Sequence, residues 1–213
     1  MTSDEVQSPQ PASADFLLEE YRMLQGRFHS LRNEGINRLN FFLTFTSAVL
    51  GGTLLLGSSG TLTPTFLKLI LLGVLVLLTG VGFDVFQFIV VRDIVTDRVE
   101  RGMSRIRRYF IEQDGHLKDF VLYPYYDDPT DYLTKKQSPG IQRTAQTIQA
   151  FTAGLGAAII TDLVSLPLIV AIGIGLAVFG LDFYALDRYA RRQLVGALDK
   201  VRGNVLFPRN VKP

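Results

Sequence analysis

Residues 65–91, TFLKLILLGVLVLLTGVGFDVFQFIVV, decide the fold class of this chain because they form a long apolar block in which only Lys68 and Asp84 are charged. An α-helix rises about 1.5 Å per residue, so roughly 20 residues cross the ~30 Å hydrocarbon core of a bilayer. The block is longer than that, which allows a tilted helix. It therefore predicts a membrane-spanning helix.

A second apolar block precedes it. Residues 36–57, INRLNFFLTFTSAVLGGTLLLG, carry no charge past Arg38. Ser58-Ser59-Gly60 then interrupts the helical pattern, and Pro64 suits the first turn of the next helix. Residues 36–91 thus predict a first transmembrane hairpin.

Residues 146–186 predict a second hairpin, with spans at 146–164 and 166–186. The span at 146–164 is the weakest of the four, because Gln146, Gln149 and Asp162 lower its hydropathy. Small residues let helix backbones approach closely in lipid, so we expect this span to pack inside the bundle. The expected packing residues are Ala153, Ala157, Gly173, Gly175, Ala177 and Gly180.

The polar parts of the chain complete an all-α membrane fold with four spans and helical extensions. Apolar residues at spacings of three and four predict that the second span continues as an amphipathic helix, with a seam of Val95, Val99, Met103, Ile106 and Phe110. The predicted segments are a disordered tail at 1–14, an amphipathic helix at 15–35, a helix and Tyr-rich loop at 92–145, and a helix and tail at 187–213.

The positions of basic residues predict the orientation. Of the 22 Lys and Arg, only Lys68 falls near the expected external connections, and the remaining 21 lie in 1–38, 92–145 and 187–213. By the positive-inside rule these three segments are cytoplasmic, so both termini are expected in the cytoplasm of a multi-pass protein of the cell (inner or plasma) membrane.

Composition excludes several chemistries. The chain has no cysteine and two histidines far apart, so we expect no disulfide, no metal site and no cofactor. No hydrolase or metalloprotease motif is present, and no nucleic-acid-binding module accompanies the basic residues. We therefore expect a protein that is not an enzyme and binds no nucleic acid.

Two intramembrane carboxylates, Asp84 and Asp182, are the strongest candidate functional residues. Ionisable residues within spans are costly and often functional. Both lie near the predicted cytoplasmic boundary at equivalent places in the two hairpins, where they could line a cation path or relay protons. The alternative is a structural ion pair with a boundary arginine such as Arg38, Arg92 or Arg188.

Two further patterns suggest ligands. Asp127-Asp128-Pro129-Thr130-Asp131 matches the DDxxD spacing that holds Mg²⁺ against a diphosphate, although Pro129 disfavours a regular helix there. Arg101, Arg105, Arg107 and Arg108 are candidate contacts for lipid headgroups, since each basic residue near an anionic surface is worth about 1 kcal/mol.

These features favour a non-enzymatic membrane protein that assembles with itself as a scaffold, effector or pore, with the bilayer as its first partner and a cytoplasmic protein binding through 94–140 as a further one. A small ion- or proton-coupled transporter, or a transporter accessory subunit, is the alternative. A Mg²⁺-dependent lipid-modifying enzyme that uses residues 127–131 is a remote third.

Overall fold

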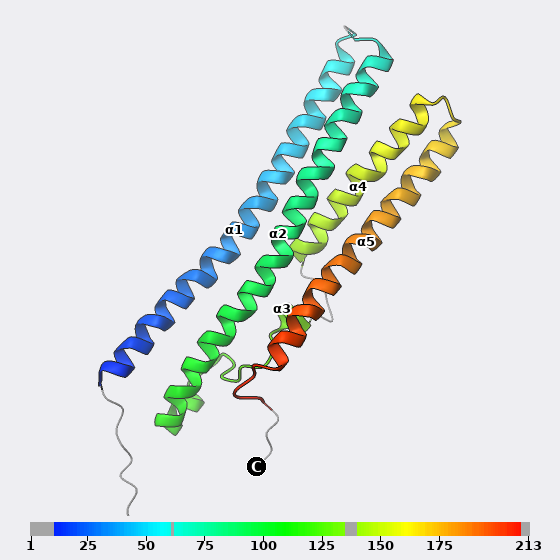
Figure 1. The fold of residues 1–213 in the computed structure, drawn as a ribbon. Helices are drawn as coiled ribbons and strands as arrows, with labels where there is room; N and C mark the ends of the chain where they lie inside the picture. The colour runs from blue at the N-terminus through cyan, green and yellow to red at the C-terminus, as the bar shows by residue number, and fades with distance from the viewer. Residues whose placement is uncertain (1–10, 61, 135–139, 210–213) are drawn as a thin grey trace, which may run out of the picture.

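Helices account for all the regular structure that the computed structural model describes, in residues 11–60, 62–134 and 140–209. Two very long helices, α1 (Pro11–Ser58) and α2 (Pro64–Gln113), are followed by the short elements η1 (Gly115–Asp119) and α3 (Asp131–Thr134). Two further long helices, α4 (Gly140–Leu163) and α5 (Leu168–Arg202), complete the fold (Figure 1).

The length of α1 and α2 shows that neither can lie wholly inside a bilayer. They contain 48 and 50 residues, which correspond to about 72 and 75 Å of helix. The amphipathic segment 15–35 and the span 36–57 are therefore parts of one uninterrupted helix. The prediction of a disordered tail at 1–14 is wrong for residues 11–14, which belong to α1. Residues 1–10 lie outside the described residues.

The structure confirms that α2 begins at Pro64 and that it continues beyond the predicted span. Pro64 occupies the first turn, and the Thr63 side chain caps the helix by accepting a hydrogen bond from the Phe66 amide at 3.4 Å. The helix continues past Arg92 to Gln113, and Val99, Met103 and Ile106 of the predicted seam are buried.

The four long helices lie side by side in the order α1, α2, α4, α5 (Figure 1). Helix α2 packs on α1 and α4, and α4 packs on α5, whereas α1 and α5 each contact mainly one neighbour. One core cluster joins all four helices, and it consists of Leu39, Phe86, Ile89, Val90, Ala145, Leu186 and Ala190. This row leaves one side of α1 and one side of α5 uncovered.

Three helices, α1, α2 and α5, are long and apolar enough to cross a membrane by length and composition, which is typical of a membrane protein. Helix α4 is not among the three, although it was expected as the third span. Its polar side chains Gln142, Gln146, Gln149 and Thr152 are buried. The interior position expected for this segment is confirmed, and it explains the low hydropathy, because these side chains face protein.

Helices α4 and α5 approach closely where each has a glycine. A Cβ atom added to Gly154 would lie 2.7 Å from the Gly175 carbonyl oxygen, and one added to Gly175 would lie 2.9 Å from the Gly154 carbonyl oxygen. The packing role expected for Gly175 is confirmed. The same role is wrong for Gly173 and Gly180, whose added Cβ atoms would meet nothing within 4 Å.

Candidate functional site

The two candidate aspartates, Asp84 and Asp182, lie in different surroundings. Asp84 is exposed on α2, and Asp182 on α5 is partly buried, with one carboxylate oxygen enclosed and without a hydrogen-bond partner. The equivalence suggested by their positions in sequence therefore does not extend to their environments.

The boundary arginines do not pair with these aspartates. Arg38 pairs with Glu34 at 2.9 Å, and Arg92 pairs with Asp93 at 2.7 Å. Within the described part of the chain, no ion pair joins Arg188 to Asp182 or any base to Asp84. The predicted alternative, an ion pair between one of these aspartates and a boundary arginine, is therefore wrong. Asp84 and Asp182 both remain candidate functional residues.

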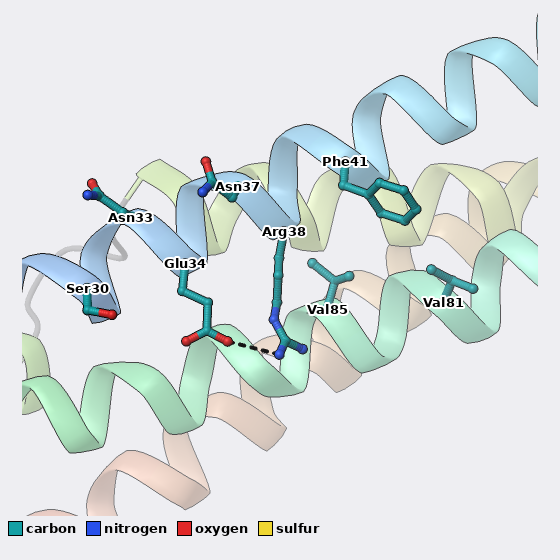
Figure 2. Close-up of a pocket in the computed structure, with 8 residues that line it drawn as sticks. All are labelled: Ser30, Asn33, Glu34, Asn37, Arg38, Phe41, Val81 and Val85. Atoms are coloured by element: carbon teal, nitrogen blue, oxygen red, sulfur yellow. Dashed lines mark hydrogen bonds and ion pairs between the residues drawn. The ribbon is translucent and has the colours of Figure 1, made fainter. Parts of the chain in front are cut away.

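A groove of about 710 Å³ runs between α1 and α2 near the predicted membrane boundary (Figure 2). Arg38 reaches from α1 towards α2 across this groove, and its guanidinium lies 3.7 Å from the centre of the Phe88 ring. The groove is lined by Ser30, Asn33, Glu34, Asn37, Arg38, Phe41, Val81 and Val85. Asn33 and Asn37 point away from α2 in this view.

Those asparagines belong to a polar stripe along the uncovered side of α1. We define the stripe as the exposed residues Ser30, Asn33, Asn37, Asn40, Thr44 and Ser47, which follow each other at spacings of three and four. At 3.6 residues per turn they share one helical face. The buried residues Leu39, Phe42 and Thr46 lie on the opposite side, and the Phe42 ring lies against Gly82 of α2.

Buried ion pairs occupy α2 beyond the predicted span. The Arg92 guanidinium lies against Gly35 of α1, where an added Cβ would overlap it. Asp97 is 1% exposed and accepts hydrogen bonds from Arg101 Nε at 3.0 Å, from the Thr130 amide at 2.9 Å and from Thr130 Oγ1 at 2.8 Å. Charge-assisted bonds of this kind fix the loop before α3 to α2.

Asp127 fastens the C-terminal segment to the same helix. Its carboxylate, 0% exposed, accepts hydrogen bonds from the Phe207 amide at 2.7 Å, the Leu206 amide at 3.0 Å and Arg105 Nε at 2.7 Å. We call these four residues the C-terminal clasp. Burial alone would raise the pKa of Asp127, but the two amides and the guanidinium outweigh it and hold that pKa below its ordinary value.

The first two aspartates of the DDxxD motif, Asp127 and Asp128, both bind the C-terminal segment through hydrogen bonds. Asp128 accepts a hydrogen bond from the Arg209 amide at 2.8 Å, and Asp131 is the first residue of α3. In the ranges that the structure describes, no group of three or more His, Asp or Glu side chains is placed to hold a metal ion. Asp127 and Asp128 act here as acceptors for backbone amides.

The four arginines expected at lipid headgroups all make contacts within the chain. Arg101 pairs with Asp97, and Arg105 pairs with Asp127. Arg107 donates to the Tyr21 hydroxyl and the Pro124 carbonyl, and Arg108 pairs with Glu112. Val91 is the last residue of the predicted second span. At about 1.5 Å per residue along α2, these arginines lie about 15 to 25 Å beyond it.

Two features escaped the sequence analysis. The polar stripe does not show in the apolar periodicity that predicts helical faces, although the spacing of its serine, threonine and asparagine residues is visible in the sequence. Arg98, Arg192 and Lys200 meet at a second cavity only because α2 and α5 are brought together. No protein-family model matches the chain, and comparisons with curated proteins and with solved structures likewise give no match.

Proposed function

We propose that this chain is a non-enzymatic, multi-pass protein of the cell (inner or plasma) membrane that assembles with copies of itself through the polar stripe of α1. Four spans and cytoplasmic termini complete the proposal. The length of α4, 24 residues or about 36 Å, supports a fourth span, as does the ion pair between Lys68 of α2 and Asp162 of α4. The concentration of Lys and Arg in residues 1–38, 92–145 and 187–213 supports cytoplasmic termini.

The polar stripe is the observation that carries this proposal. Asn37, Asn40, Thr44 and Ser47 lie within the predicted first span, on the side of α1 that no other helix covers. Hydrocarbon offers these side chains no hydrogen-bond partners. Amides and hydroxyls both donate and accept, so the same stripe on a second copy is chemically complementary.

The expected strength fits reversible association. Interhelical hydrogen bonds in membranes contribute about 0.6 kcal/mol each. Four such positions on each copy would contribute about 2 to 3 kcal/mol, to which close packing adds. If more than two copies meet, the same face would line a polar axis, which is the pore version of the proposal.

Cysteine cross-linking tests this interface cleanly, because the chain has no cysteine of its own. Ser47→Cys in native membranes is expected to form a disulfide-linked dimer rapidly on oxidation, since a disulfide requires Cβ atoms about 3.5 to 4.5 Å apart. The product is measured as a band of doubled mass on non-reducing gels.

Val76→Cys is the matched control. Val76 is 65% exposed on α2, and it lies at a similar depth, because Gly82 of α2 faces Phe42 of α1. We expect little cross-linking at Val76. Equal cross-linking at the two positions would contradict an interface centred on the polar stripe.

The far end of the helical extension offers a second surface for assembly. Leu122, Phe120 and Tyr123 are 96%, 79% and 67% exposed, next to a small apolar cavity of about 190 Å³. Gln113 lies about 33 Å of helix beyond Val91, so lipid cannot cover these side chains. Large exposed apolar patches on proteins mark interaction sites.

The double substitution Phe120→Asp and Leu122→Asp is expected to reduce the assembled mass in mild detergent, measured by light scattering after subtraction of the detergent. Val195→Asp, on an exposed apolar position of α5, is the control and should leave the mass unchanged. If the double variant keeps its full mass, this surface does not join copies, and a different cytoplasmic protein that binds through 94–140 becomes its proposed partner.

Two other functions have less support. A small ion- or proton-coupled transporter or accessory subunit would rest on Asp84 and Asp182, but α1, α2, α4 and α5 run without the unwound segments that form many transporter sites. A lipid-modifying enzyme would need Asp127 and Asp128 to bind Mg²⁺, whereas both are occupied by backbone amides.

A further inference from the structure

A cavity of about 370 Å³ lies between the extensions of α2 and α5 beyond the predicted spans. This volume falls within the range of about 300 to 1,000 Å³ that is typical of small-molecule sites. The cavity is lined by Ile94, Asp97, Arg98, Arg101, Arg192, Gln193, Gly196, Ala197, Lys200, Val201 and Asn204.

The charge of this lining is strongly positive. Four of its side chains are basic and one is acidic. The acidic side chain, Asp97, is already neutralised, because Arg101 and Thr130 donate hydrogen bonds to it. Among the described residues, Arg98, Arg192 and Lys200 form no ion pairs.

Arg101 adds a buried donor to the cavity wall. Its residue exposure is 8%, and its Nη1 atom is buried without a hydrogen-bond partner. An unpaired donor on a buried cation is costly, because the group has lost water without a replacement. Because Nη1 is closed to solvent, an anionic oxygen in the cavity would satisfy it only after the guanidinium turns, and the guanidinium fork matches phosphate geometry.

From the unpaired cations and this buried donor we infer that the cavity between α2 and α5 binds a phosphate-bearing anion. Arg98, Arg192 and Lys200 supply the surrounding positive charge, and Arg101 supplies the inner donor. The apolar side chains of Ile94 and Val201 line part of the wall and suit a ligand that carries a less polar group beside its phosphate.

Two sources of such a ligand can reach the cavity. Arg98 lies about 10 Å of helix beyond Val91, close to the outer limit of the headgroup layer, which extends about 5 to 8 Å beyond the hydrocarbon. A phospholipid headgroup could enter from the membrane side. A soluble phosphate ester could enter from the water.

The experiment uses the full chain in nanodiscs of two compositions. In discs of neutral phosphatidylcholine, ATP and inorganic pyrophosphate are titrated by calorimetry. In parallel, native mass spectrometry measures retention of phosphatidic acid from discs that contain it. The variant combines Arg192→Glu with Lys200→Glu, two exposed positions whose substitution should not unfold the chain.

Binding of each probe, whether ATP, pyrophosphate or phosphatidic acid, is expected to weaken about 100-fold in the double variant, because each lost charge-assisted contact is worth about tenfold. Arg188→Glu is the control, since it makes the same charge change as Arg192→Glu alone, lies one turn away on α5 and does not line the cavity. This control should change binding by less than about twofold.

Each outcome decides the inference. Soluble probes that bind and are lost in the double variant identify a water-borne ligand, and phosphatidic acid retained and lost in the same way identifies a lipid headgroup. Absence of binding by ATP, pyrophosphate and phosphatidic acid alike, or equal weakening by Arg188→Glu, would overturn the site. None of these results depends on self-assembly through α1.

Discussion

Replacing Gly175 by leucine is expected to separate α4 from α5 and to lower the stability of the whole bundle. A Cβ at this position would lie 2.9 Å from the Gly154 carbonyl oxygen and 3.0 Å from the Ala158 Cβ, so the backbones must move apart. Overpacking of this kind costs about 3 kcal/mol, which lowers the unfolding temperature by about 10 °C. The remaining monodisperse protein is measured by size-exclusion chromatography after heating in detergent.

Gly173→Leu provides the control on the same helix. A Cβ at Gly173 would meet nothing within 4 Å, so the larger side chain has open space around it. We expect no loss of stability from this variant, since leucine is a better helix former than glycine and suits a lipid-facing position. If both variants lose stability equally, the close contact between α4 and α5 is not what the substitution disturbs.

The second large effect is expected at the C-terminal clasp. Asp127→Asn removes the charge that pairs with Arg105 and leaves one acceptor oxygen for two amides. Losing such a buried acceptor costs about 3 kcal/mol, which corresponds to roughly 100-fold faster opening of the segment. Hydrogen exchange at the Leu206 and Phe207 amides measures this opening directly.

The pH dependence of the same exchange follows from the lowered pKa of Asp127. The ordinary pKa of an aspartate is about 3.9, and the folded-state pKa of Asp127 lies below it. Its charged carboxylate therefore stabilises the folded state to the full extent when the pH is above this ordinary pKa. This stabilisation is lost as the pH falls through the folded pKa. Protection of the Leu206 and Phe207 amides, corrected for intrinsic exchange rates, should therefore be constant near neutrality. It should decrease once the pH is lower than about 4.

Asp131→Asn is the control for the clasp. Asp131 belongs to the same acidic motif, but it is exposed at the start of α3, and the two amides donate to Asp127 instead. Its substitution should leave exchange at Leu206 and Phe207 unchanged. Equal acceleration by both variants would show that the motif holds the segment by general charge and not by the hydrogen bonds of Asp127.

The helices of this chain were easier to predict than its sites, because helical periodicity is local in sequence. The continuation of α2 past Arg92 was correct because the seam from Val95 to Phe110 keeps its helical spacing across the boundary. The four arginines are candidates for lipid contact in the sequence because positive charge near a span ordinarily faces headgroups. Their actual partners, such as Asp127 and Glu112, depend on how the loop and helix lie in space.

An all-helical chain with segments long and apolar enough to cross a membrane could be predicted without the structure, because hydrophobic length and helical periodicity are local properties. Tertiary structure alone decided which face of each helix is covered. The row of helices leaves the polar stripe of α1 open, buries the glutamines of α4 and gathers Arg98, Arg192 and Lys200 at one cavity, and the C-terminal segment folds over Asp127. Those relations join residues far apart along the chain, and only packing brings them together.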